Sequence, residues 1–164
     1  FIACTNINDT VPRYLDSGNY EPKKSISTIS NAMDVGDPSN FIRIQKLFNN
    51  DFQKLKKKVN GYAFTDPQTR KAIKEIHTKS KYIADPHGAL SYLGLKTYLE
   101  GLEKDTAQGI FFETAHPIKF APTVEATLKL KIDPPKQIEK VLDKPSLSIS
   151  ISDYKSLKDF FLAR

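Results

Sequence analysis

The sequence has little of several residue types that mark common classes of protein. One cysteine, Cys4, excludes a disulfide within the chain and a cysteine-based metal cluster, and it fits a reducing, cytoplasmic environment. Within the apolar stretch FIACT we expect Cys4 to be a small buried side chain, not a nucleophile. The seven glycines are isolated, so no glycine-rich phosphate loop is present. No stretch approaches the ~20 apolar residues that span a bilayer, which argues against a membrane protein.

Arginine is also scarce, and this bears on the net charge of +6. The densest basic run, Lys54 to Lys58, falls on a predicted helix whose other face is apolar. With only four arginines, and with the remaining lysines scattered along the chain, the charge predicts a solvated lysine-rich surface. We therefore expect no nucleic-acid partner.

Caps and three-to-four-residue spacing of apolar side chains predict that helices dominate the chain. Its 164 residues suffice for one domain, 1–164, with successive segments 1–18, 19–84, 85–130 and 131–164. The short apolar strands lie far apart in sequence, which is typical of an α/β fold of parallel strands with helical crossovers. The expected helices cover residues 10–16, 41–59 with a break near Asn49 and Asn50, 67–79, 86–100, 121–129, 135–142 and 153–161.

Two apolar runs are predicted to be buried parallel strands that end in polar residues. The run 1–5 leads to Asn6, Asn8 and Asp9, of which Asn8 or Asp9 is expected to cap the next helix. The run 110–116 is predicted to deliver Thr114 and His116 to a sheet edge, with Pro117 opening a helix or turn. Ligands of open α/β sheets bind beyond the carboxyl ends of the strands, so these residues are site candidates as well as turn-forming residues.

Composition and spacing alone do not reveal a reaction. No serine lies in a Gly-x-Ser-x-Gly turn, and no histidine pair has the spacing of a metal site. A metal bound by His87, His116, Asp85 and Asp34 stays open as an alternative without motif support. From the residues alone the chain is part of a soluble α/β domain.

Four segments carry a resemblance to one enzyme family. They are FIACTNINDTVPRYL (1–15), ISNAMDVGDPSNFIRI (29–44), DPHGALSYLGL (85–95) and GIFFETAHPIKF (109–120). In this order and at this spacing, the chain resembles the C-terminal portion of threonine synthase. This family of fold-type II pyridoxal-phosphate enzymes converts O-phospho-L-homoserine and water to L-threonine and phosphate.

The resemblance implies pyridoxal 5'-phosphate as cofactor and a lyase-type elimination of phosphate, followed by water addition. Thr114 stands at the motif position whose hydroxyl contacts the pyridine nitrogen of the cofactor. A neutral hydroxyl there would leave that nitrogen largely unprotonated. Further polar residues in turns and at strand ends are candidates for lining the substrate pocket, each with a turn, cap or core role as the alternative: Asn6, Asn8, Asp9, Asn31, Asp34, His87 and His116.

The resemblance also implies that part of the site lies elsewhere. In the family, the Schiff-base lysine and the loop that holds the cofactor phosphate precede the segment matched by Phe1–Asn6. We therefore expect a C-terminal fragment of the large domain, inactive alone, whose partner is the N-terminal part of the same protein. Such a fragment would expose apolar edges and either self-associate or adopt a partial fold. A threonine synthase-like phospholyase and a non-catalytic interaction module stay open as alternatives.

Overall fold

The computed structural model describes residues 1–103, 107–142, 144–145 and 147–163. The chain divides into two compact units, Phe1–Ile132 and Asp133–Arg164. The first unit contains the parallel strands and most of the helices, and it carries all of the candidate site residues. The α/β class and the abundance of helix predicted from the sequence are confirmed.

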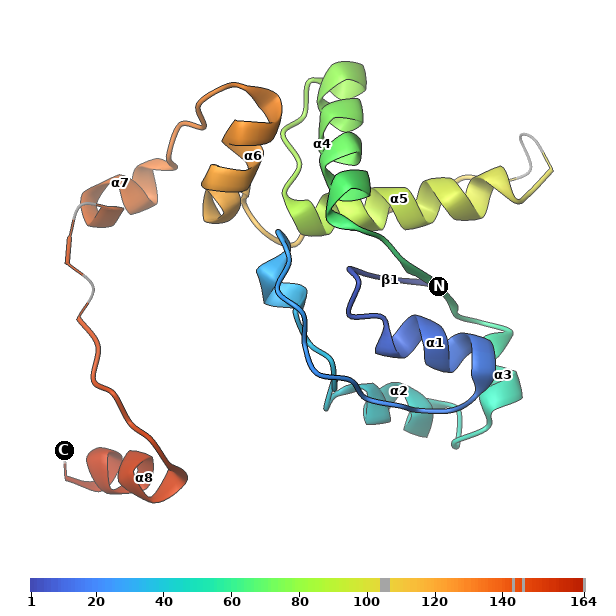
Figure 1. Cartoon of the computed structure of the whole chain (residues 1–164), viewed down its shortest axis with the longest axis horizontal. Coiled ribbons are helices and arrows are strands. Elements are labelled where there is room, and N and C mark those ends of the chain that lie inside the picture. Colours follow the sequence, from blue (N-terminus) through green and yellow to red (C-terminus); the bar gives the residue numbers. More distant parts are fainter. Residues whose placement is uncertain (104–106, 143, 146, 164) are drawn as a thin grey trace. The chain divides into compact units, whose positions relative to one another are not determined.

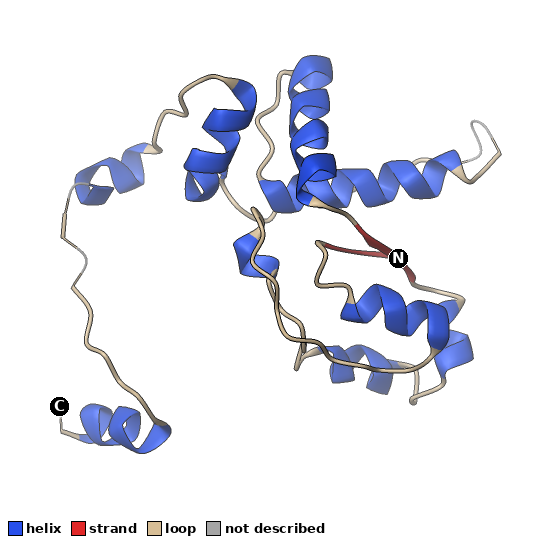
Figure 2. Ribbon diagram, in the orientation of Figure 1, coloured by secondary structure: helices blue, strands red, loops and turns tan. Residues whose placement is uncertain are grey.

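Two short parallel strands form the sheet of the first unit (Figure 2). Strand β1 (Ile2–Thr5) is the predicted N-terminal strand, although it is half-buried. Strand β2 (Asn60–Ala63) was not predicted, because the sequence NGYA shows neither alternation nor an apolar run. Gly61 of β2 lies against Pro12, where a Cβ atom would be 2.8 Å from the Pro12 Cα. That close approach explains why glycine occupies this strand position.

Helices α1 (Thr10–Ser17), α2 (Phe41–Leu47) and α3 (Phe52–Lys56) share an apolar core that includes Tyr14 and Leu55. Gly18, with φ of 80°, ends α1 as predicted. Asn49 and Asn50 adopt φ values of 54° and 58°, which confirms the break predicted between α2 and α3. The connection before α2 contains one short 3-10 helix, η1 (Asn31–Met33).

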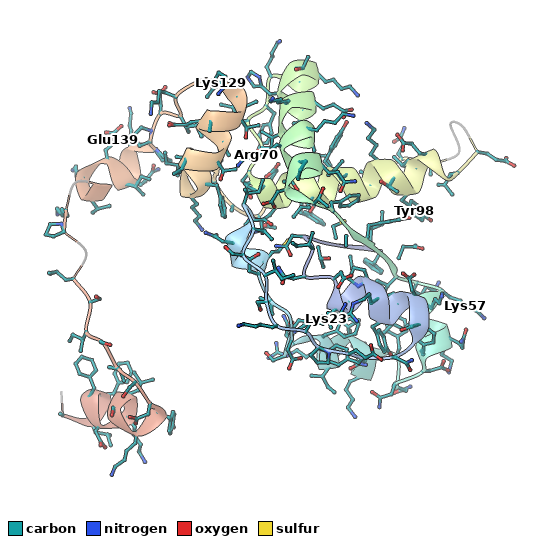
Figure 3. All side chains as sticks on the ribbon, in the orientation of Figure 1. Lys23, Lys57, Arg70, Tyr98, Lys129 and Glu139 are labelled. Atoms are coloured by element: carbon teal, nitrogen blue, oxygen red, sulfur yellow. The ribbon has the colours of Figure 1, made fainter. Side chains whose placement is uncertain are left out.

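Helices α4 (Asp66–Ser80) and α5 (Pro86–Glu100) cross and pack together (Figure 1). A Thr65–Gln68 capping box opens α4, and the Asp85 carboxylate caps α5, both close to their predicted starts. Helix α6 (Ala121–Leu128) packs on α4, where Arg70 Nη1 donates a 2.7 Å hydrogen bond to Thr127 Oγ1 (Figure 3). Among the described residues, no helix is long and apolar enough to cross a membrane.

The prediction of a buried strand over 110–116 is wrong. Described residues from 107 to 116 form no strand, and Ile110 and Phe112 are 84% and 75% exposed. A strand requires backbone partners, and within the described residues β1 and β2 pair only with each other. The segment nevertheless alternates, since Phe111, Glu113 and Ala115 are half-buried between exposed residues. Pro117 then opens the 3-10 helix η2 (Pro117–Phe120), as predicted.

The described helices of the second unit are α7 (Lys136–Leu142) and α8 (Tyr154–Leu162). Asp153 caps α8 by accepting a 2.8 Å hydrogen bond from the Ser156 backbone N–H. Both helices were predicted to within about one residue at their starts. Tyr154 and Phe161 of α8 are exposed.

Candidate functional site

A set of polar side chains, three of them buried and two half-buried, lies where β1 ends, and we call it the strand-end cluster. Its members are Asn6, Asn8, Thr28, Ser30 and Asp34. Asn6 Nδ2 lies 2.9 Å from Asp34 Oδ1, and Asn8 Nδ2 lies 3.2 Å from the same oxygen. The sequence predicted Asn6, Asn8 and Asp34 as site residues, and the fold does bring these three together.

Each member of the strand-end cluster has hydrogen-bond partners inside the protein. Asn6 Oδ1 accepts bonds from the backbone and side chain of Asn8, while Asp34 accepts from the Thr28 backbone and hydroxyl. Asn8 also exchanges two hydrogen bonds with the backbone of Ile26. These contacts fasten the long connection before α2 to the end of β1. The cluster therefore holds that loop in one conformation.

Two other predicted residues lie outside this cluster. Asp9 stands at the start of α1, but its side chain makes no capping hydrogen bond, and neither does that of Asn8. The predicted side-chain cap is therefore wrong. Asp9 Oδ1 instead accepts a 2.8 Å bond from Arg13 one turn later, which neutralises its charge. Asn31 is exposed at the start of η1.

Thr114 lines a cavity of about 480 Å³ between β1, α5 and the segment 107–114. Its side chain is exposed, and the other polar side chains that line the cavity include Ser91 and Tyr98 of α5. Tyr98 extends from the part of α5 that borders this cavity (Figure 3). The rest of the lining is mostly apolar and comes from β1, α5 and the extended segment: Phe1, Ile2, Cys4, Leu95, Leu99, Ala107, Gln108, Gly109, Ile110, Phe111 and Phe112.

Cys4 of β1 is a free cysteine, and its side chain packs against α5. A Cβ atom at Gly94 of α5 would overlap the Cys4 sulfur, so glycine admits the thiol at that point. Burial raises the pKa of the Cys4 thiol to about 11, which the Gly94 backbone only partly offsets. The thiol is therefore protonated at neutral pH and a poor nucleophile, in accord with the packing role expected for it.

A second buried polar set, the carboxyl cluster, lies at the first turn of α5 and consists of Asp85, His87 and Glu113. Asp85 is fully buried, and its Oδ1 accepts hydrogen bonds from the His87 backbone at 2.8 Å and the His87 ring Nδ1 at 2.7 Å. The Glu113 carboxyl rests on Gly88, where a Cβ atom would overlap it. The 110–116 segment is thereby attached to the start of α5.

The carboxyl cluster contains more acceptors than donors. Asp85 Oδ2 and both Glu113 oxygens are buried without a hydrogen-bond donor among the described residues. Burial, and then the neighbouring Asp85 carboxyl, raise the pKa of Glu113 to about 8. Burial opposes ionisation of Asp85 as well, but hydrogen bonds from His87 and Glu113 outweigh it and hold the Asp85 pKa below its usual value. The two shifts therefore favour a proton on Glu113 over one on Asp85.

The two histidines predicted to line a pocket both interact with η2. The His87 ring is buried and meets the Phe120 ring edge-on, with centroids 4.8 Å apart. His116 is exposed, and its Nδ1 accepts a 3.1 Å hydrogen bond from the Ile118 N–H, which caps η2. Among the described residues, no group of three or more histidine, cysteine or acidic side chains is arranged to hold a metal ion.

Sequence reasoning missed Glu113, and considered Asp85 only as a metal ligand. The available signal was a charged residue inside the apolar run of 110–115, where an ionised carboxylate would be costly to bury. Its partner Asp85 is 28 positions away (113 − 85), so local pattern could not supply the pair.

Comparisons of sequence and of structure match this chain to threonine synthases. The family model described as "Threonine synthase, C-terminal" matches residues 93–160. A threonine synthase of Buchnera aphidicola subsp. Acyrthosiphon pisum (strain APS) is 44% identical over 165 residues, which cover 100% of this chain and 37% of that protein. The chain thus spans about 37% of the length of this relative.

Solved structures give the same result for the fold. The crystal structure of threonine synthase from Escherichia coli matches with a TM-score of 0.86 at 37% identity, covering 99% of this chain and 37% of that chain. A PLP-bound threonine synthase from Brucella melitensis matches with a TM-score of 0.75 at 26% identity, over 97% and 39% of the two chains. The resemblance drawn from the four sequence segments, to the C-terminal portion of threonine synthase, is confirmed.

Proposed function

We propose that this chain, which is similar from end to end to threonine synthases, forms the C-terminal part of an enzyme of that activity. The complete protein would convert O-phospho-L-homoserine and water to L-threonine and phosphate with pyridoxal 5'-phosphate as cofactor. The observation that carries this proposal is the match of the whole chain, including the Thr114 segment, to threonine synthases at 37–44% identity. One of the structural relatives is described as PLP-bound.

The Thr114 cavity has the chemistry that a pyridine ring requires. Apolar side chains of β1 and α5 offer surfaces for a flat aromatic ring, and Thr114 offers one neutral hydroxyl at the edge. When bound, pyridoxal phosphate supplies the electron sink for elimination and addition reactions at carbon. We assign Thr114 as the partner of the ring nitrogen. A neutral hydroxyl there lets that nitrogen stay unprotonated, which moderates the electron withdrawal.

The other candidates divide into two roles under this proposal. The polar atoms of three of them, Asn6, Asn8 and Asp34, already hydrogen-bond to one another. We therefore assign these three to holding the loop 19–40 against the end of β1. Asn31 and His116 are exposed and keep hydrogen-bonding capacity for a polar substrate. Asp9 and His87 are engaged by Arg13 and Asp85, so we assign them to orienting the turns that carry the site.

The rest of the site is proposed to come from the part of the protein that precedes this chain. That part would provide the lysine that holds the cofactor and the loop that binds its phosphate. The 164 residues alone would then be inactive. Their exposed apolar side chains, such as Ile110 and Phe112, would favour self-association. We place the complete enzyme in the cytoplasm.

The direct test is to assay the complete protein with O-phospho-L-homoserine and pyridoxal phosphate, and to quantify every product. Threonine and phosphate in equal amounts are expected. Phosphate with 2-oxobutyrate and no threonine would overturn the proposal in favour of a related phospholyase. If neither threonine nor 2-oxobutyrate is formed, the protein has a non-catalytic role. The chain 1–164 assayed alone serves as the control and should release no phosphate.

A further inference from the structure

The alternation of the 110–116 segment links the carboxyl cluster to the Thr114 cavity. Glu113 and Ala115 turn inward and are half-buried, whereas Thr114 and His116 are exposed. In extended backbone, successive side chains point to opposite sides. Whatever fixes the Glu113 side chain inward therefore also fixes the direction of the Thr114 hydroxyl. No strand partner among the described residues performs that task, because this segment lies outside the sheet.

The Glu113 side chain packs against the first turn of α5. Its carboxyl occupies the space above Gly88, where any Cβ atom would overlap it. Both of its oxygens are buried, and neither has a hydrogen-bond partner among the described residues. The fully buried Asp85 is committed through one oxygen to the His87 ring and backbone, which leaves Asp85 Oδ2 without a donor. If both carboxyls were ionised, three buried oxygens would lack any donor.

A single proton corrects this imbalance. A protonated Glu113 can donate to the Asp85 carboxylate, which converts the repulsion of two buried anions into a charge-assisted hydrogen bond. The other titratable groups that face the pair are His87, on the far side of Asp85, and Tyr82, in the loop before α5. Burial raises the pKa of Tyr82, and the two carboxyls raise it further. Among the described residues, no lysine or arginine forms an ion pair with Asp85 or Glu113.

We propose that Glu113 is a positioning residue: it shares one proton with Asp85 over the first turn of α5, and this hydrogen bond directs the Thr114 hydroxyl into the cavity beside Ser91. The inference rests on the proposed function only in the role that it gives to Thr114. It also predicts pH dependence. As pH rises through about 8, Glu113 loses the shared proton, the carboxylates repel each other, and the segment 110–116 loosens.

Turnover of the complete holoenzyme at different pH values tests the catalytic consequence. One pH unit above the pKa only about a tenth of Glu113 keeps its proton, so wild-type kcat should be roughly tenfold lower near pH 9 than near pH 7. Glu113→Gln can donate to Asp85 without a titrating proton. It should keep kcat near pH 7 within about threefold and lose the alkaline decline. Glu113→Ala should be slow at both pH values, and Glu100→Gln, an exposed charge on α5, should follow the wild type.

A second measurement does not depend on substrate or activity. Amide hydrogen exchange of the 110–116 segment, corrected for intrinsic rates, should show protection near pH 7 that falls near pH 9 in the wild type but not in Glu113→Gln. If the protein made no threonine while this pattern held, the proposed function would fail and the proton-sharing pair would stand. Equal pH dependence of the wild type and Glu113→Gln, in exchange and in any turnover, would overturn the pair.

Gly88→Ala fills the space that the Glu113 carboxyl occupies and leaves Glu113 itself unchanged. Alanine favours helix, and the group it meets is the mobile end of Glu113, so the protein should fold. Displacement of Glu113 should nonetheless lower kcat near pH 7 about as far as Glu113→Ala does. A folded Gly88→Ala protein with wild-type kcat and wild-type exchange of the 110–116 segment would contradict the inference.

Discussion

The strand-end cluster and the carboxyl cluster are both buried and polar, but they differ in how their hydrogen bonds balance. In the first, the amides of Asn6 and Asn8 supply donors to Asp34 and to backbone carbonyls. In the second, Asp85 and Glu113 bring four carboxyl oxygens, and within the described part of the chain the N–H groups that hydrogen-bond to them belong to His87. A balanced network needs no proton from solvent and fixes a loop at any moderate pH. An acceptor-rich one depends on a bound proton, and so responds to pH.

The largest effect on stability should come from breaking the balanced network. Asn6→Ala removes the donor that serves Asp34, Thr28 and Ser30, as well as the oxygen that accepts from Asn8, so several polar groups of the cluster each lose one hydrogen bond. We expect a loss of about 3 kcal/mol in the free energy of unfolding. The urea midpoint of the complete protein measures it. Asn31→Ala, at an exposed position nearby, should change the free energy of unfolding by no more than about 0.5 kcal/mol. If Asn6→Ala lowered it no more than Asn31→Ala does, the cluster would not be stabilising.

Thr114→Ala should separate function from folding more clearly than any change in either cluster. Because Thr114 is exposed, the free energy of unfolding should change by less than about 0.5 kcal/mol. Because its hydroxyl is assigned to the cofactor nitrogen, kcat should fall at least about tenfold, or about 1.4 kcal/mol in activation free energy. Thr114→Ser keeps the hydroxyl and should retain most of the turnover. Unchanged kcat in Thr114→Ala would refute the assignment of this residue.

Glu75 provides the smallest effect and a useful contrast with Glu113. Hydrogen bonds from Lys79 at 2.6 Å, Lys96 at 2.9 Å and Tyr92 at 2.8 Å lower the pKa of Glu75 to about 2. Its contribution to stability is therefore fully present above the usual glutamate pKa, near 4.5, and is lost as pH falls toward 2. Since solvent reaches this group, we expect less than about 1 kcal/mol.

The measurement is the difference in Tm between the wild type and Glu75→Gln at neutral pH and near pH 3. The difference should be larger at neutral pH and shrink in acid. Glu113 works in the opposite direction. Its folded pKa is raised from 4.5 to about 8, so its contribution to stability falls as pH rises between those values. A Glu75→Gln difference that grows in acid would show that the lysines do not act on this carboxylate.

Helices were predictable from the sequence because their signals are local. Thr65 with Gln68, Asp85 before Pro86, and Asp153 all start helices within one residue of the predicted positions. The breaks were local too, since asparagine tolerates the left-handed backbone seen at Asn49 and Asn50. Strand β1 was found from its apolar run, and the three residues Asn6, Asn8 and Asp34 converge because they follow or face its end.

Contacts between residues that lie far apart in the sequence could not be predicted. Strand β2 is a strand only because it pairs with β1, 58 positions earlier in register (60 − 2). The segment 110–116 has the alternation of a strand, but pairing with another strand, which alternation does not reveal, is absent among the described residues. No local pattern pairs Glu113 with Asp85 and Gly88, which the fold places beside it. In each case the decisive partner is outside any local window.

The central claim, that Glu113 holds a proton at neutral pH, can be tested by infrared spectroscopy. The difference spectrum between the complete wild-type protein and Glu113→Gln near pH 7 should contain the carbonyl band of a protonated carboxylic acid. That band should disappear as the pH is raised about one unit above 8, where most of the pair is ionised. A spectrum near pH 7 that shows only the bands of an ionised carboxylate for Glu113 would contradict the account.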